Sequence, residues 1–394
     1  MKFNRDLEEK YIAPTYKRQP IAVKEGNGVI VKDDEGKEYI DFVGGLAVCS
    51  LGHSHPALSK AICEQAKKLT HISNLYHIPP QAELAEKLAE ITPGKINKFF
   101  FCNSGTEAVE SALKLAIKHT KRKKVIAFEG SFHGRTSASV GATWNKSYKK
   151  PFEALIPPIF EFSPFDDLVS ARNKIDDKTA AIIIEPIQGE GGVNVPSDDF
   201  LPGLREICDE NNVLMISDEV QAGMGRTGKW FACENWGVKP DIITMAKALG
   251  NGFPIGCMGA KNEVMNSFTP GDHASTFGGN PLACTVGKTV IDTMKNDEIL
   301  ARAQEIGSYF KKELEELVKE HEICSETRGI GLMLALELKE KKIAESVLKK
   351  IREKGFLINL TAEKVLRFVP PLIVKKKHIN KLISTLSEVL EEVS

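Results

Sequence analysis

The 394-residue sequence lacks an excess of charge of either sign, a long apolar run and a secretion signal. Lys and Arg together number 53, as do Asp and Glu, so there is no basic surplus for binding nucleic acid or an anionic membrane. No apolar run reaches the roughly 20 residues of a membrane-spanning helix, and residues 1–10 are too charged for a signal peptide. We therefore expect a cytoplasmic protein with neither nucleic-acid nor membrane partners.

The cysteines and histidines lack the spacings of a disulfide framework or a metal site. None of the eight cysteines forms a C-x-x-C pair, and most lie in apolar stretches, as reduced core thiols do. The nine histidines show no metal-ligand spacing, so we expect no bound metal ion. The sequence has no internal repeat, and its length allows two domains with a large core.

Short apolar runs alternate with helical stretches in the middle of the chain. Continuous apolar runs indicate strands that are buried on both faces, as in a mostly parallel sheet covered by helices. This region therefore predicts an α/β fold. The expected strands are 98–102, 125–128, 180–185, 213–217 and 242–245, and the expected helices are 107–119 and 200–211.

The pattern differs on either side of this region. Residues 21–42 alternate weakly around an acidic turn, which predicts a hairpin, and residues 56–91 look helical with a break at Pro79-Pro80. The elements expected after Pro281 are helices 282–320 (broken near Asn296), 343–354 and 376–392 and strands 331–338, 356–360 and 365–369. We predict an N-terminal segment (1–50) that packs with the small domain, a large domain (51–290) and a C-terminal small domain (291–394).

Charged residues follow two consecutive strands of the expected sheet. Lys247 comes after the apolar run 242–245, and Asp218 follows the run 213–217. Open α/β sheets bind their ligands at the carboxyl ends of the strands. A lysine there can form a Schiff base with an aldehyde cofactor, and a carboxylate can keep a pyridinium nitrogen protonated. The alternatives are a surface lysine and a structural acid.

Two glycine-containing loops could complete such a site. Residues 103–108 (Asn-Ser-Gly-Thr-Glu-Ala) open a helix with the spacing of a capping box, and the amides of Gly105 and Thr106 could hold a phosphate. The later loop Gly-Ser-Phe-His-Gly-Arg-Thr offers the ring of Phe132 for stacking and the guanidinium of Arg135 for a carboxylate. Taken alone, the first motif is also consistent with an ordinary helix cap. The second is also consistent with a core ring at Phe132 and a solvated arginine at Arg135.

Three further polar residues follow or interrupt apolar stretches. Glu190 lies in a glycine-rich loop, which is either a tight functional loop or an exposed turn. Gln221 lies three residues after Asp218, where the two side chains could meet opposite edges of a pyridine ring. Arg367 interrupts an apolar strand, and a buried arginine needs a carboxylate partner, either in a structural pair or in a site.

Two other glycine-rich stretches remain. Residues 273–281 form a polar loop whose Ser275 and Thr276 hydroxyls could hold an anion, or simply a loop before a helix. Residues 223–229 have the spacing of a phosphate-binding P-loop, but the next residue, Trp230, has no hydroxyl for magnesium. A nucleotide-binding P-loop protein is therefore the nearest alternative of a different class, and Trp230 disfavours it.

In their order along the chain, the motifs resemble those of the class III pyridoxal-phosphate aminotransferases of fold type I. The resemblance covers nearly the whole chain. The resemblance implies a large domain with a mostly parallel seven-stranded sheet, a smaller α+β domain and the cofactor pyridoxal 5'-phosphate. The matching stretches are 103–108, 132–136, 185–192, 218–221, Lys247 and 276–281.

The resemblance also implies the cofactor contacts. Lys247 would form the Schiff base with the cofactor, and Asp218 would pair with its pyridine nitrogen. Thr276 would reach the phosphate of the neighbouring subunit, which implies a homodimer with shared sites. The implied cofactor-binding residues are Gly105, Thr106, Phe132, Asp218, Val220, Gln221, Lys247 and Thr276.

Within the family, the sequence is most similar to members that move the terminal amino group of N-acetylornithine to 2-oxoglutarate, a step of arginine biosynthesis. Arg135, helped by Ser275, would bind the donor carboxylate. Arg367 would bind the α-carboxylate of glutamate, and Glu190 would pair with Arg367 when an ω-amine is bound. Leu46 stands where members that prefer free ornithine carry a tyrosine. Other donors in the family are 4-aminobutyrate, succinyl-diaminopimelate and carrier-linked lysine.

Overall fold

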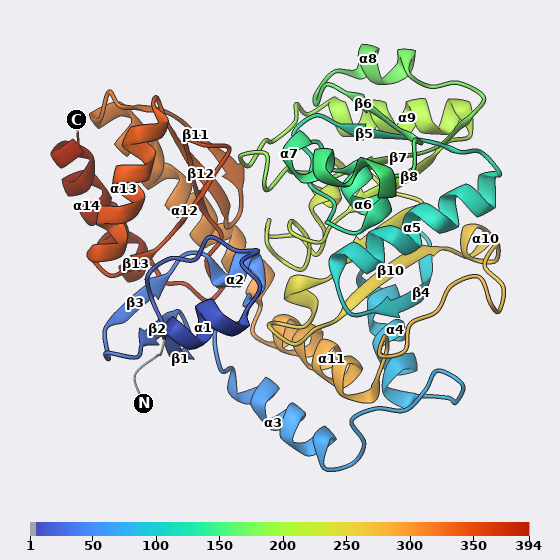
Figure 1. The fold of residues 1–394 in the computed structure, drawn as a ribbon, viewed down its shortest axis with the longest axis horizontal. Coiled ribbons are helices and arrows are strands. Elements are labelled where there is room, and N and C mark those ends of the chain that lie inside the picture. Colours follow the sequence, from blue (N-terminus) through green and yellow to red (C-terminus); the bar gives the residue numbers. More distant parts are fainter. Residues whose placement is uncertain (1–4, 394) are drawn as a thin grey trace.

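The computed structural model describes residues 5–393, and a seven-stranded sheet forms the centre of the larger lobe (Figure 1). The strand order is β4-β10-β9-β8-β7-β5-β6, and only β10 runs antiparallel to its neighbours among the described strands of this sheet. The predicted mostly parallel α/β sheet is confirmed. The strands are β4 (Ile96–Cys102), β5 (Lys124–Phe128), β6 (Phe160–Ser163), β7 (Thr179–Ile184), β8 (Leu214–Asp218), β9 (Ile242–Met245) and β10 (Gly256–Lys261).

Both faces of this sheet are buried, which explains why its central strands are mostly apolar on both faces. In β5, Val125 and Ala127 belong to one apolar cluster, whereas Ile126 and Phe128 belong to another on the opposite face. Helix α5 (Gly105–Thr120) contributes its apolar side chains to the first cluster. Helix α9 (Phe200–Asn211) contributes to the second.

Two strands of this sheet are absent from the sequence-based prediction. The short β6 lies at the sheet edge, and the glycines of β10 give it a low strand propensity. Packing explains one of these glycines, because a Cβ atom on Gly259 would lie 2.7 Å from the ring of Phe99 on β4. The close approach of β4 and β10, rather than strand propensity, therefore explains the glycine at this position of β10.

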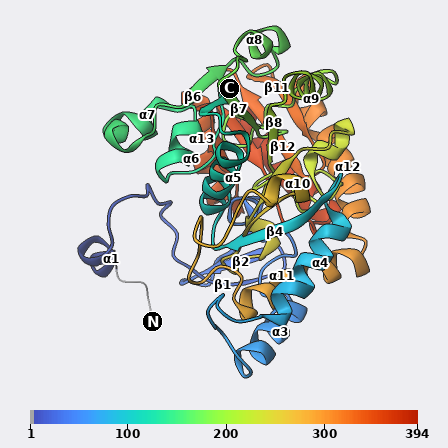
Figure 2. The same cartoon turned by 90° about the vertical axis from the view of Figure 1, so that its right-hand side faces the viewer.

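The N-terminal part begins with α1 (Arg5–Tyr11), which has no buried residue and lies apart from the body of the molecule in Figure 2. Three strands follow where a two-stranded hairpin was predicted, and residues 67–78 are not helical. Pro79 and Pro80 begin a helix, since a missing amide costs nothing in the first turn. These elements are β1 (Val23–Asn27), β2 (Ile30–Asp33), β3 (Glu38–Asp41), α3 (Pro56–Ala66) and α4 (Pro79–Ile91).

The C-terminal part contains a second sheet with the strand order β11-β12-β15-β14. Strand β13 instead pairs in parallel with β3, so the N-terminal strands and one C-terminal strand form a third sheet. The elements are α11 (Pro281–Asn296), α12 (Ile299–Glu320), β11 (Cys324–Ile330), β12 (Met333–Leu338), α13 (Lys341–Glu353), β13 (Phe356–Leu357), β14 (Asn359–Thr361), β15 (Val365–Phe368) and α14 (Lys376–Val393).

The predicted domain boundary at residue 290 lies inside α11, a continuous helix. The predicted break near Asn296 is present, because α11 ends at that residue and α12 begins at Ile299. The division into segments 1–50, 51–290 and 291–394 stays a prediction, and residues 1–4 and 394 lie outside the described part of the chain.

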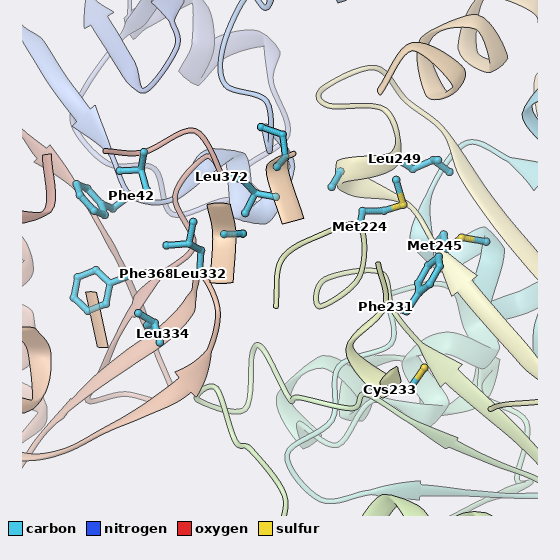
Figure 3. Close-up of a cluster of buried hydrophobic side chains, with 14 of the residues drawn as sticks. Phe42, Met224, Phe231, Cys233, Met245, Leu249, Leu332, Leu334, Phe368 and Leu372 are labelled. Carbon is cyan, nitrogen blue, oxygen red and sulfur yellow. The ribbon is translucent and has the colours of Figure 1, made fainter. Parts of the chain in front are cut away.

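One apolar core joins these parts. The ring of Phe310 on α12 lies 5.7 Å from that of Phe42 after β3 and 5.3 Å from that of Phe368 on β15. The same cluster extends to the large sheet. Figure 3 shows two groups of labelled side chains. On the left are Phe42 from the N-terminal segment and Leu332, Leu334, Phe368 and Leu372 from the C-terminal part, and on the right are Met224, Phe231, Cys233, Met245 and Leu249.

Across residues 5–393, no helix is long and apolar enough to cross a membrane. In the same range, no group of three or more His, Cys, Asp or Glu side chains is arranged to hold a metal ion. The eight cysteines are free thiols, and six of them are buried. The cytoplasmic location stays a prediction.

Candidate active site

A pocket of about 410 Å³ lies at the carboxyl ends of the parallel strands. Parallel strands end at one edge of a sheet, so residues that follow distant strands meet there. All of the predicted cofactor-binding residues except Thr276 line it, together with Arg135. The lining consists of Val48, Asn103, Ser104, Gly105, Thr106, Phe132, His133, Gly134, Arg135, Glu185, Asp218, Val220, Gln221, Ala246, Lys247 and residues 252–255.

Lys247 begins a short 3₁₀ turn just after β9 and lines the pocket. Its φ of 44° is in the left-handed region, which costs on the order of 1–3 kcal/mol for a residue with a side chain. Burial lowers the pKa of its amine to about 8, and Arg367 acts in the same direction against the pull of nearby carboxylates. Part of the amine population is therefore uncharged near neutral pH, as a nucleophile requires.

Asp218 ends β8 and is only 3% exposed. Its carboxylate accepts hydrogen bonds from the hydroxyl of Thr244 at 2.9 Å and from the amide of Val220 at 3.1 Å. The buried His133 donates from Nδ1 to the same carboxylate at 2.7 Å, and its Nε2 has no partner within residues 5–393. These contacts fix a negative charge at the pocket wall, where it can stabilise a cation.

Helix α5 directs its N-terminus into the pocket. Ser104 caps the helix by accepting a hydrogen bond from the amide of Glu107, as the capping-box spacing predicts. The amides of Gly105 and Thr106 precede the first intrahelical bond, so they are available to an anion. A Cβ atom on Gly105 would lie 2.7 Å from the side chain of Val220, so only glycine fits at this end of the helix.

Phe132 and Arg135 lie at the rim of the pocket. The guanidinium carbon of Arg135 is 5.4 Å from the ring centre of Phe132 and 5.0 Å from that of Tyr148. Arg135 is exposed and makes no ion pair within the described part of the chain. It can therefore bind an anionic group that enters the pocket.

Arg367 lies on β15 and is fully buried. Its Nη1 donates to Glu190 Oε1 at 2.7 Å and to Gln221 Oε1 at 2.9 Å, and its Nε donates to Asn359 at 2.8 Å. The carboxylate partner expected for a buried arginine is therefore Glu190. Burial raises the pKa of Glu190, but the charge of Arg367 outweighs this effect, so the pKa lies below its ordinary value.

Ser275 and Thr276 lie outside this pocket, on the loop before α11. Ser275 accepts hydrogen bonds from the side chain of Asn103 at 3.2 Å and from the amide of Gly278 at 3.0 Å. Thr276 is exposed. The predicted contact of Thr276 involves a second copy of the chain and stays a prediction.

The glycine-rich stretch 223–229 does not form a P-loop, because it consists of turns and does not open an α-helix. Its Arg226 is buried and donates to the carbonyls of Leu332 at 3.1 Å and Pro370 at 2.5 Å and to the hydroxyl of Ser50 at 3.3 Å. Burial lowers the pKa of Arg226 to about 9. This stretch therefore has a structural function.

Among the pocket residues missing from the sequence-based site are Glu185, His133 and Val48. Glu185 follows an apolar strand just as Asp218 does, and that signal could have identified it. His133 belongs to a recognised loop motif, but its contact with Asp218 depends on the fold. Val48 comes from the N-terminal segment, and no local pattern predicts its place in the wall.

Comparisons with known proteins identify the family. The family model for aminotransferase class-III matches residues 11–390. The acetylornithine aminotransferase of Aquifex aeolicus is 51% identical over 387 residues, which cover 96% of this chain and 100% of that protein. That of Methanocaldococcus jannaschii is 45% identical over 398 residues, with 98% of each protein covered.

Solved structures agree with this assignment. Ornithine aminotransferase from Toxoplasma gondii, which holds pyridoxal phosphate at partial occupancy in its active site, matches with a TM-score of 0.94 at 32% identity, covering 99% of this chain and 94% of that one. Acetylornithine aminotransferase from Elizabethkingia anophelis matches with a TM-score of 0.88 at 33% identity and 98% coverage of both chains. The chain belongs to the class-III aminotransferases.

Proposed function

We propose that this protein is a pyridoxal-phosphate-dependent aminotransferase that moves the terminal amino group of N-acetylornithine to 2-oxoglutarate. The observation that carries the proposal is that the Lys247 amine, with its lowered pKa, shares one pocket with the firmly held Asp218 carboxylate. The choice of donor is supported by relatives that are 43–51% identical and are named acetylornithine aminotransferase.

The pocket residues fit pyridoxal phosphate. The free amides of Gly105 and Thr106 suit its phosphate, Asp218 suits its ring nitrogen, and the ring of Phe132 suits its flat face. A Cβ atom on Gly134 would overlap the Thr106 hydroxyl, so glycine keeps this cradle open. When bound, the cofactor supplies an aldehyde that takes up amino groups and a ring that accepts negative charge from the reacting carbon.

Lys247 is the proposed general base. With a pKa of about 8, its amine can take a proton from the substrate carbon and return it near neutral pH. Asp218 would stabilise positive charge at the ring nitrogen of a bound cofactor. Because His133 and Thr244 hold Asp218 in place, the carboxylate need not move as charge develops during the reaction.

Two substrates of different charge pattern use this pocket in turn. Arg135 would take the carboxylate of the donor, assisted by Ser275, and Arg367 would take the α-carboxylate of glutamate or 2-oxoglutarate. While the ω-amine is bound, Glu190 neutralises Arg367 through their 2.7 Å ion pair. The Glu190 side chain is 35% exposed, so it has room to turn away and release Arg367.

We also propose a homodimer with shared sites. The loop that carries Thr276 also exposes Phe277, at 61% of its surface, and the nearby loop exposes Leu75, at 86%. Large apolar side chains at such exposure favour a protein–protein interface. Light scattering of the purified protein measures its oligomeric state, and loss of phosphate affinity in Thr276→Ala tests the shared contact.

Three other donors use the same chemistry, namely 4-aminobutyrate, succinyl-diaminopimelate and carrier-linked lysine. Leu46 disfavours free ornithine by the family resemblance. It is 44% exposed and lies two residues before Val48, which lines the pocket. Steady-state rates for a panel of these amines with 2-oxoglutarate identify the donor, and the highest kcat/KM is expected for N-acetylornithine.

The covalent role of Lys247 has a direct test. Borohydride treatment of the protein with pyridoxal phosphate, followed by peptide mapping, should place the adduct on Lys247. Lys247→Ala should fold and lose amino transfer by a factor of at least about 10³, the scale of losing a general base. A label on another lysine, or normal turnover by Lys247→Ala, would overturn the proposed function.

A further inference from the structure

Glu185 is a buried carboxylate in the pocket to which the proposed reaction assigns no role. It follows β7 and is 5% exposed. It lines the pocket together with Lys247, Asp218 and His133. A buried carboxylate must be hydrogen-bonded to persist at such a position, so its partners indicate what it does.

Its two oxygens bind the amides of two different loops. Oε2 accepts from the amide of Phe132 at 2.8 Å, and Oε1 accepts from the amide of Gly189 at 3.3 Å. Phe132 lies in residues 130–136, here called the ring loop. Gly189 begins residues 189–192, here called the gate loop, which carries Glu190. One side chain therefore spans the loop that would hold the cofactor ring and the loop whose Glu190 pairs with Arg367.

The gate loop is also held from the C-terminal sheet. The hydroxyl of Thr361 donates to the carbonyl of Glu190 at 2.5 Å, and Nε of Arg328 donates to the carbonyl of Gly192 at 3.0 Å. The stems of the two loops are also joined, because Gln188, just before the gate loop, donates to the carbonyl of Glu129, just before the ring loop, at 2.7 Å. Unlike these contacts, the hydrogen bond between Glu185 and Phe132 joins two residues that line the pocket.

We propose that Glu185 is a positioning residue that couples the ring loop to the gate loop, so that Phe132 and Glu190 hold a fixed arrangement relative to each other. The inference rests on the proposed function, which gives Phe132 and Glu190 their roles. It predicts that one substitution at Glu185 weakens cofactor binding and donor binding together.

Protonation should weaken this link. Burial raises the pKa of Glu185 to about 7, with His133 opposing and Asp218 adding to the rise, and Lys247 lines the same pocket. A protonated carboxyl has one oxygen that accepts well, so one amide contact weakens. The longer contact, to Gly189, should be the one that opens as the pH falls below about 7.

The chain offers a matched control in Glu219. This residue follows the neighbouring strand β8, is 1% exposed, and accepts hydrogen bonds from the amides of Ala232 at 2.8 Å and Cys233 at 2.9 Å. Burial raises its pKa to about 7 as well. Glu219 does not line the pocket. Glu219→Gln therefore reproduces the loss of a buried strand-end carboxylate without touching the two loops.

The first experiment measures amide hydrogen exchange in the cofactor-free protein at pH 8. Glu185→Gln should speed exchange in both 130–136 and 189–192, while Glu219→Gln should speed it near 232–236 only. Faster exchange in one loop alone, or in neither, overturns the coupling. If Glu185→Gln does not fold, Glu185→Asp keeps the charge but is too short to reach both amides, and the same pair of changes is expected.

The second experiment titrates pyridoxal phosphate and measures KM for N-acetylornithine. In Glu185→Gln both the cofactor Kd and the donor KM should rise about tenfold, the effect of one lost charge-assisted hydrogen bond. In Glu219→Gln both should stay within about twofold. Equal losses in the two variants would show a general structural effect and overturn the proposal. An adduct away from Lys247 would overturn the function but leave the exchange result standing.

Discussion

The amine of Lys247 couples the stability of the protein to pH. Its pKa is about 8 in the folded chain, against about 10.4 in an unfolded chain. Between these values the unfolded chain binds more protons than the folded chain, so the stability contributed by this group rises with pH. Below pH 8 the charged lysine lowers stability by its full amount, and above about pH 10.4 it has no effect.

We expect Lys247→Met to stabilise the cofactor-free protein at neutral pH, because methionine has a similar length and no charge to bury. The melting temperature at pH 7 should rise by roughly 2 °C or more. The gain should shrink between pH 8 and 10. Differential scanning calorimetry over this range checks the prediction, and a pH-independent gain would contradict it.

At the same scale, Glu190→Gln should separate the two substrates. Glutamine keeps the shape of the side chain but not the charge that neutralises Arg367. The donor KM should rise about tenfold, as for one lost charge-assisted contact, whereas KM for 2-oxoglutarate should stay the same or fall. Steady-state kinetics with each substrate varied in turn supply the measurement. A parallel rise in both constants would contradict the masking role of Glu190.

Among the elements, the turn α2 (Gly44–Ala47) is unusual because four successive residues have positive φ angles, from 54° to 67°. Left-handed backbone costs about 1–2 kcal/mol for each residue with a side chain, here Leu46 and Ala47. Tertiary contacts must hold the turn. Gly44 lies so close to the residue after β15 that a Cβ atom there would be 2.8 Å from the carbonyl oxygen of Val369.

Gly44→Ala should therefore destabilise the protein more than strain at φ alone explains. Gly36 is the control, since its φ is also positive, at 89°, but a Cβ atom there has no neighbour within 4 Å in the described structure. Gly44→Ala should cost about 1–3 kcal/mol more than Gly36→Ala, because a backbone atom must move. Urea unfolding of both variants measures the difference, and equal losses would rule out the clash.

The sequence predicts elements well where a strand is buried on both faces. It predicts them poorly where contacts with other elements determine which residues are present. The apolar runs identify β5, β7, β8 and β9, because strands covered on both faces have no polar side. Strand β10 escapes prediction because its glycines are selected by the neighbouring strand. The left-handed turn α2 escapes as well, since no local signal specifies positive φ at Leu46 and Ala47.

The same distinction applies to the site. Lys247 and Asp218 are found from sequence because each follows an apolar strand, and parallel strands end together. His133, which holds Asp218 in place, comes from a loop 85 residues earlier in the chain. Asn359, which holds Arg367, lies opposite it on the neighbouring strand β14. The first contact arises only when the fold brings distant segments together, and the second depends on the register of two short strands, so no spacing in the sequence predicts them.

On the scale of the whole molecule, Arg226 connects three parts of the chain. It donates to Ser50 in the N-terminal segment and to Leu332 and Pro370 in the C-terminal part. Within residues 5–393 it makes no ion pair, and its Nε has no partner. A buried cation held by carbonyl dipoles ties these parts into one body.

Arg226→Met should loosen this junction, because the carbonyls that accept from the guanidinium lose their donor. We expect a loss of about 3 kcal/mol, the sum for two or three unsatisfied buried groups. Arg172→Met is the control: Arg172 is 53% exposed and pairs with Glu210 at the surface, so its loss should stay within about 0.5 kcal/mol. Calorimetry of both variants distinguishes them, and equal melting temperatures would refute the role of Arg226.

The N-terminal segment supplies Val48 to the pocket wall, while every group proposed to carry charge or protons comes from other parts of the chain. Part of the pocket wall is thus encoded in a stretch of the gene separate from that of the reactive groups. A chimera that exchanges residues 43–50 with those of a relative could change which amine is accepted and leave the reactive groups untouched. Such modularity offers a simple route by which one scaffold diversifies its substrates.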